Sequence, residues 1–174
     1  MALRQILTEP NKILREKSLS VENVDKDVQI LMDDMLETMY AAPGIGLAAI
    51  QVGIPKRVIV LDIEQKEGQK NPICLVNPEI IKKSKNNSTY EEGCLSVPGQ
   101  FAEIDRPDKC HVKYLDYYGE KKEIKAEGML AICIQHEIDH LEGILFIDYL
   151  SKLKKTMIIK KLSKQKKAIE RIVV

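Results

Sequence analysis

The chain has 174 residues and a formal net charge of +1, with 44% hydrophobic and 30% charged residues. This length suits a single domain with one core, and the composition excludes a collagen-like or wholly disordered chain. Its apolar runs fall short of the roughly 18 residues that a membrane-spanning helix needs.

The first predicted element is an amphipathic helix over residues 25–40, where apolar residues recur every three or four positions. Pro43, Gly44 and Gly46 end this helix, and the β-branched run at 57–63 predicts a strand.

Further strands are predicted at residues 73–76, 79–82 and 109–117, with 121–126 as the hairpin partner of the last. Asn86, Asn87 and Ser88 predict a loop. A second helix is predicted over 128–142, ending at Gly143. We therefore expect an α+β fold: antiparallel β-sheets packed around a central helix, with an N-terminal and a basic C-terminal helix. Residues 1–150 form the expected catalytic domain, and 151–174 form a basic helical tail rather than a second domain.

The N-terminal residues carry acids and lack a long apolar run, so we expect no secretory or transit peptide and a cytoplasmic protein. The four cysteines show no paired zinc-ribbon spacing, which favours reduced thiols. Their positions are Cys74, Cys94, Cys110 and Cys133.

The motif HEIDH at residues 136–140 predicts a metal site on the second helix. His136 and His140 are four residues apart, so they project from one helical face and can bind one ion together. Glu137 then lies beside the open coordination position, where it can take a proton from the attacking water. A chance match is the alternative, which the helical context disfavours.

A catalytic metal site usually has three protein ligands, so a third must come from elsewhere. The candidates are His111, Cys94, Cys133, Glu142, Asp148 and Glu170. Ligands at 133, 136 and 140 on one straight helix would span about 10 Å, too far for one ion. Cys94 lies in EEGCLSVPG, whose Gly and Pro residues predict a turn that can aim a thiolate at the helix, so we favour it.

The segment GIGLAAIQ at residues 44–51 contains GxGxxA, which alone would suggest a dinucleotide-binding turn. That fingerprint must follow a strand and open a helix, whereas here a helical pattern and Pro43 precede it. We interpret the segment as a loop whose glycines let the backbone approach a ligand, with the Gln51 amide as a hydrogen-bond donor. A plain surface or turn position for Gln51 is the alternative.

GIGLAAIQ, EEGCLS and QHEIDH, in this order, closely resemble the three signature motifs of the peptide deformylase family. The resemblance runs from the start of the chain to about Tyr149. It implies an enzyme that removes the formyl group from the N-formylmethionine of new bacterial or organellar proteins, with Fe²⁺ as the physiological metal and Zn²⁺, Ni²⁺ or Co²⁺ able to replace it. The implied site residues are the metal ligands Cys94, His136 and His140, the catalytic acid Glu137, and the donors to the substrate oxygen, Gln51 and the Leu95 backbone N–H.

A deformylase also needs an apolar pocket for the Met side chain, and any residue placed there can instead be ordinary core. The residues expected to contact substrate are Gly44, Ile45, Gly46, Glu92, Gly93, Met129, Ile132 and Cys133. Glu92 is also a candidate for orienting a ligand histidine. Phe101 departs from the family pattern, because several relatives carry a basic residue there.

The tail at 151–174 holds nine Lys or Arg residues and one acid, Glu170. A helix there would have an apolar stripe of Leu153, Met157, Leu162, Ile169 and Ile172. Such a helix can be simply solvated, or it can bind ribosomal RNA phosphates, an interaction that weakens steeply with salt.

Two other functions stay open: a peptidase that uses HEIDH, and a binding protein with a structural metal. Glu137 and Gln51 argue against the second, because a structural site needs neither. The expected partners are N-formylmethionyl nascent peptides and, through the tail, the ribosome; we expect neither a membrane nor DNA.

Overall fold

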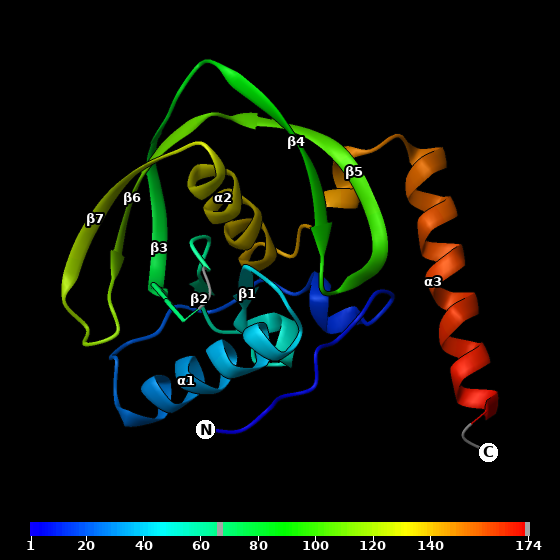
Figure 1. Cartoon of the computed structure of the whole chain (residues 1–174), viewed down its shortest axis with the longest axis horizontal. Coiled ribbons are helices and arrows are strands. Elements are labelled where there is room, and N and C mark those ends of the chain that lie inside the picture. Colours follow the sequence, from blue (N-terminus) through cyan, green and yellow to red (C-terminus); the bar gives the residue numbers. More distant parts are fainter. Residues whose placement is uncertain (66–67, 173–174) are drawn as a thin grey trace.

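Two antiparallel β-sheets enclose the helix that carries HEIDH (Figure 1). The protein is seen in a computed structural model that describes residues 1–65 and 68–172. Its elements in chain order are η1 (Lys12–Arg15), α1 (Lys26–Ala41), β1 (Gly46–Ala48), η2 (Ala49–Val52), β2 (Val58–Leu61), β3 (Ile73–Lys83), β4 (Asn87–Cys94), β5 (Val97–Pro107), β6 (Lys109–Leu115), β7 (Lys121–Glu127), α2 (Met129–Leu141), η3 (Phe146–Tyr149) and α3 (Lys152–Ile172), where η marks a 3₁₀-helix.

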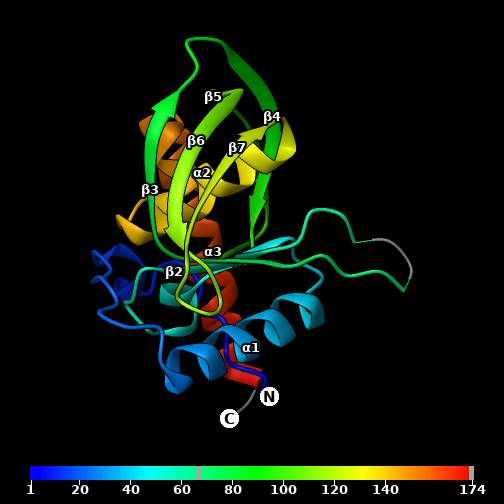
Figure 2. The ribbon, with the colours of Figure 1, turned by 90° about the vertical axis from the view of Figure 1, so that its left-hand side faces the viewer.

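The larger sheet has the strand order β1-β2-β3-β6-β7, and the smaller sheet is the hairpin β4-β5. Every pairing is antiparallel. Figure 2 shows α2 between these strands, with α1 packed below them. The α+β expectation is confirmed, including the central helix and the two flanking helices.

Helix α1 forms as its apolar spacing predicts. The Asp25 carboxylate caps it by accepting a 3.0 Å hydrogen bond from the Val28 N–H. The face toward β1 and β2 is buried and consists of Val28, Leu31, Met32, Met35 and Met39. The methionine stripe is therefore core, as the sequence indicates.

Helix α2 is predicted to within a residue at each end. Gly143, with φ of 74°, follows its C-terminus, and a Cβ there would collide with the backbone of Arg15. Only glycine accepts both the left-handed backbone and this close approach.

The strand predictions at 73–76 and 79–82 are wrong in one respect, because both belong to the single strand β3. The pairing with β6 shifts register between Val76 and Glu79, and Asn77 has φ of 49°. A bulge tolerates both a proline and a left-handed asparagine, so Asn77 and Pro78 bend the strand without ending it. The Asn77 side chain also makes two 2.8 Å hydrogen bonds to the backbone of Val21, which hold the bulge in place.

Two other segments predicted as loops are partly strands. Asn87 and Ser88 begin β4, and β5 follows after a two-residue turn. Residues 46–48 of GIGLAAIQ form β1, which pairs with β2, rather than a loop. These strands are glycine-rich, charged or very short, so their own residues give little β preference and sheet pairing decides their conformation.

The apolar stripe predicted for the tail helix is right at Leu162 and wrong at its other four positions, Leu153, Met157, Ile169 and Ile172, which are exposed. In α3 the buried residue is Leu162, and Ile158 and Ile159 pack with it against η3 and β5. Leu153 and Ile169 are instead exposed, because their positions lie off the face that the core covers. Residues 173–174 of the predicted tail lie outside the described residues.

None of the helices in the described part of the chain is both long and apolar enough to span a membrane.

Candidate metal centre and active site

Cys94, His136 and His140 converge at one point between α2 and the end of β4. One ligand atom from each lies within 4.8 Å of the other two, and the Cys94 Sγ is 3.3 Å from the His140 Nε2. The two imidazole rings meet edge to face, with centroids 5.0 Å apart. Two imidazoles and a thiol form the donor set that Zn²⁺ and similar divalent ions prefer, so these residues fit a metal ion with an open position.

The position of Cys94 follows from the β4-β5 hairpin. Cys94 is the last residue of β4, and it pairs with Val97 across a turn of two residues. The register shifts between Gly93 and Cys94, which turns the cysteine out of the regular strand alternation. The turn in EEGCLSVPG thus brings the thiol to α2.

His136 is oriented by a buried chain of charged groups. Its Nδ1 lies 2.9 Å from the Glu92 carboxylate, which also accepts bonds of 2.5 and 3.0 Å from Arg106. Arg106 in turn contacts Asp139 at 2.8 Å. Because the Glu92 carboxylate accepts, the His136 Nδ1 carries a proton. Burial lowers the pKa of His136, but the hydrogen bonds to Cys94 and Glu92 outweigh this and hold it well above its usual value, so a metal ion at Nε2 would replace a proton there. Phe146 stacks over the His136 ring, with centroids 6.3 Å apart.

Burial shapes the protonation of this site. It lowers the pKa of His140 well below its usual value, so His140 is neutral, which is the form that binds metals. Burial also raises the pKa of Glu92, but hydrogen bonds from His136 and Arg106 outweigh this and leave the pKa below its usual value. Glu92 is therefore an anion, bonded to both His136 and Arg106.

Gln51 is buried in η2, and its side chain has a fixed orientation. Its Oε1 accepts a 2.8 Å bond from the Ala48 N–H, and its Nε2 donates to the Ser96 Oγ at 3.0 Å. The same Nε2 lies 3.5 Å from the Cys94 Sγ. The amide N–H group thus lies beside Cys94, where it can donate to an acceptor in the cavity.

Glu137 is buried beside the ligands, and its Oε2 has no hydrogen-bond partner among the described residues. Burial raises the pKa of Glu137 to about 7. A carboxylate of this kind can both accept and release a proton near neutral pH. A Cβ at Gly46 would collide with this carboxylate, so β1 can pass so close only because residue 46 is glycine.

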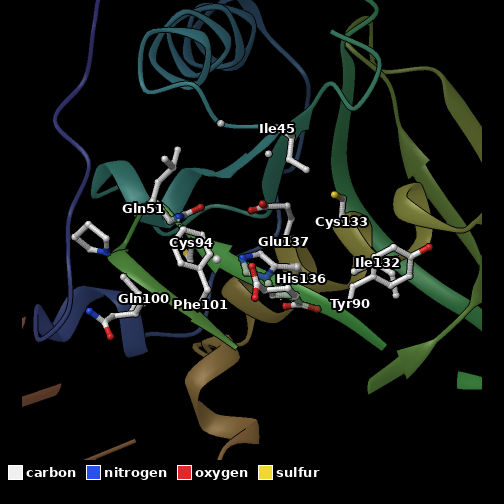
Figure 3. A pocket seen from close by; sticks show the side chains of 18 of the residues that line it. Ile45, Gln51, Tyr90, Cys94, Gln100, Phe101, Ile132, Cys133, His136 and Glu137 are labelled. Atoms are coloured by element: carbon white, nitrogen blue, oxygen red, sulfur yellow. Dashed lines mark hydrogen bonds and ion pairs between the residues drawn. The ribbon is translucent and has the colours of Figure 1, made fainter. Parts of the chain in front are cut away.

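Gln51, Cys94, His136 and Glu137 line a cavity of about 480 Å³. Figure 3 shows Gln51, Cys94, His136 and Glu137 gathered along it, with Ile132 and Cys133 farther along. The residues predicted to contact substrate all line it: Gly44, Ile45, Gly46, Glu92, Gly93, Met129, Ile132 and Cys133, together with Leu95. Burial raises the pKa of Cys133 to about 12, so its thiol is an apolar part of the wall.

Sequence reasoning missed several lining residues of this cavity, among them Tyr90, Val97, Pro98 and Gln100. All of them belong to β4 and β5. Tyr90 and Glu92 alternate with exposed residues, and this period of two is the weak sequence signal of β4.

The other candidate ligands lie elsewhere. Glu142 pairs with Arg57 and Lys17, Asp148 with Arg15 and Lys155, and His111 with Glu123, while Glu170 is exposed on α3. Cys133 lines the cavity but is not part of the ligand group.

A family model described as polypeptide deformylase matches residues 3–156. The peptide deformylase of Pelagibacter ubique (strain HTCC1062) is 67% identical over 166 residues, which are 95% of this chain and 96% of that protein. That of Phenylobacterium zucineum (strain HLK1) is 56% identical, over 97% of this chain and 99% of that protein. The crystal structure of peptide deformylase from Ehrlichia chaffeensis in complex with actinonin superposes with a TM-score of 0.89 at 48% identity, covering 95% of this chain and 98% of that one. A peptide deformylase structure from Legionella pneumophila gives a TM-score of 0.90 at 46% identity, covering 98% and 99%.

Proposed function

The chain belongs to the peptide deformylase family, a family of hydrolases that remove the formyl group from N-terminal formylmethionine, and we propose that Cys94, His136 and His140 hold its metal ion. The chain is an enzyme of this kind, and its reaction releases formate and a free amino terminus. The observation that carries the assignment of the site is the convergence of these three ligands beside the buried carboxylate of Glu137.

We propose Fe²⁺ as the physiological ion, which is what the family resemblance implies, with Zn²⁺, Ni²⁺ or Co²⁺ able to occupy the same ligands. When bound, such an ion polarises the formyl oxygen and makes water a better nucleophile near neutral pH. The donor set fits it: His140 is held neutral by burial, and the Glu92 carboxylate holds the proton of His136 on Nδ1.

Glu137 is the general base and then the general acid. Its unpartnered Oε2 takes a proton from water as the water oxygen attacks the formyl carbon. The same carboxyl group then returns a proton to the departing amine when the C–N bond breaks.

Gln51 and Leu95 stabilise the charge that develops on the formyl oxygen. The Gln51 Nε2, held beside Cys94, donates one hydrogen bond, and the Leu95 backbone N–H donates another. One such donor contributes about 3 to 4 kcal/mol to stabilising the transition state. The Gln51 amide is held in place before substrate binds by its bonds with Ala48 and Ser96, so little reorganisation of this donor opposes the reaction.

The Met side chain of the substrate occupies the apolar part of the cavity. Ile132 and Cys133 are buried in its wall, while Ile45 and Met129 are more exposed. Burial of an unbranched thioether against these groups favours Met over a polar side chain by the apolar area removed from water.

Formate release from N-formyl-Met-Ala-Ser tests this assignment. We expect Glu137→Ala to lower kcat by about 10²- to 10⁴-fold with metal still bound, and Cys94→Ser to lose both metal and activity. Cys110→Ser is the matched control, because Cys110 is a buried cysteine of β6 that is not part of the ligand group. Cleavage of unformylated peptides without formate release would instead identify a peptidase. Full activity of Cys94→Ser would refute the ligand set.

We also propose that the enzyme is cytoplasmic, that residues 1–150 form its catalytic domain, and that residues 151–174 form a basic helical tail. The outward lysines of α3, among them Lys160 and Lys167, are exposed and suit ribosomal RNA phosphates. Cosedimentation with ribosomes over a salt series, with wild type and a Lys160→Glu/Lys167→Glu variant, tests this. Binding that is unchanged in the variant would refute it.

A further inference from the structure

A second groove, of about 630 Å³, lies between β5 and α3. Residues 100–103 of β5 form one side, and Lys154, Met157, Ile158 and Lys161 of α3 form much of the other. Figure 1 shows α3 standing beside β5 along this side of the molecule. We call this feature the β5–α3 groove.

The β5–α3 groove adjoins the active-site cavity. Gln100 and Phe101 line both of them, so the two hollows meet on β5. The Phe101 side chain is 65% exposed, although it is large and apolar. A chain that leaves the active site across Phe101 therefore passes directly into the groove.

The α3 side of the groove combines apolar and cationic groups. Lys154, Met157, Ile158 and Lys161 recur at steps of three and four residues, so they share one face of the helix. Met157 is 61% exposed, and neither lysine has a carboxylate partner among the described ion pairs. Glu103, on the β5 side, is the acidic residue of the described lining, so the lysines outnumber it.

The spacing of the lysines suits an extended peptide. Seven residues of an α-helix rise about 10 Å, which separates Lys154 from Lys161 along α3. An extended chain advances about 3.3 Å per residue, and every second side chain lies on the same face. Side chains four residues apart are about 13 Å from each other on one face, a span that two flexible lysine side chains on helix positions about 10 Å apart can reach. Met157 and Ile158 lie between the two lysines and offer an apolar surface to a residue between those side chains.

We propose that the β5–α3 groove binds the downstream part of the formylated polypeptide in extended form, with a preference for apolar and acidic side chains. The proposal rests on the proposed function, because the occupant is the chain whose formylmethionine lies in the cavity. That cavity, of about 480 Å³, holds only the first residues of a nascent polypeptide, so the following residues must leave along the surface. The groove continues from the cavity along the surface, and its lysines favour acidic side chains in the residues that follow the formylmethionine.

The test compares N-formyl-Met-Ala-Ser with two nine-residue peptides that begin with the same sequence. In one, residues 4–9 contain Leu and Glu; in the other, Leu and Lys. We expect the acidic peptide to have a KM about fivefold below that of the basic peptide, with kcat unchanged, as two exposed charge contacts would produce. The Lys154→Glu/Lys161→Glu variant should reverse this order and hydrolyse the tripeptide as wild type does.

The Lys160→Glu/Lys167→Glu variant is the matched control, with the same charge change and the same seven-residue spacing on α3 outside the groove lining. It should retain the wild-type preference. Equal KM values for both long peptides would overturn the proposal, as would an equal effect of both double variants, which would indicate the general field of α3. A concentration-dependent dimer in sedimentation velocity that Lys154→Glu/Lys161→Glu dissociates would also overturn it, by assigning the groove to a second copy. Failure of wild type to deformylate the tripeptide would refute the proposed function instead.

Discussion

Replacing Glu92 by glutamine tests whether a buried carboxylate positions His136, a proposed metal ligand. Glu92→Gln keeps the shape of the side chain but removes the charge that accepts two bonds from Arg106 and one from His136. Breaking a buried ion pair costs about 3 to 5 kcal/mol. Arg106 keeps its 2.8 Å contact with Asp139, so we expect the lower value, about 3 kcal/mol in the free energy of unfolding. Metal affinity should fall about 10- to 100-fold.

Urea unfolding at fixed metal concentration and competition with a chelator measure the two effects. The chain offers a matched control, because His111 and Glu123 form the same kind of pair on the surface, at 2.8 Å. Glu123 is 61% exposed, whereas the Glu92 side chain is 5% exposed, so Glu123→Gln should change stability by less than about 1 kcal/mol. Equal losses in the two variants would refute the argument from burial. Unchanged metal affinity in Glu92→Gln would refute the positioning of His136.

Three further predictions concern packing and metal binding. Gly46→Ala should lower kcat about 10²-fold by displacing the Glu137 carboxylate, with the fold retained by circular dichroism; wild-type kcat would refute the close approach. Phe146→Ala should cost about 3 to 5 kcal/mol in urea unfolding, because Phe146 is fully buried and stacks on His136, and a cost below about 1 kcal/mol would contradict this. Removing the metal with a chelator should lower the Tm of the wild type by several degrees, and adding the metal back should restore it. The Tm of Cys94→Ser should not change with chelator or metal. A Tm change equal to that of the wild type would exclude Cys94 as a ligand.

Interactions between near neighbours in the chain could be predicted from the sequence. The helix at 25–40 and the strands that end in the β6-β7 hairpin follow from local periodicity. The pairing of His136 with His140 follows from the pitch of a helix, which places residues four apart on one face. The position of Glu137 beside these two histidines follows from the same motif.

Contacts between segments far apart in the chain could not be predicted from residue spacing alone. Cys94 is more than forty residues from His136, so helix spacing could not connect the two. The turn residues around Cys94 favoured it over the other candidate ligands, and the family resemblance then implied it. Strands β4 and β5 were missed because their glycines and charges give only a weak strand preference. Their partners across the hairpin supply the hydrogen bonds that make them strands.

The sequence by itself therefore determined the helix that carries HEIDH, the residue proposed as general acid and base, and the family, because these depend on residues within a few turns of one another or on intact motifs. The tertiary structure alone decided the partners of Glu92, the close approach of Gly46 to Glu137, and the face of α3 that packs on the core. It also decided the groove that joins β5 to α3. Each of these depends on contacts between segments far apart in the chain, whose geometry is set by the packing of the whole core rather than by any local preference.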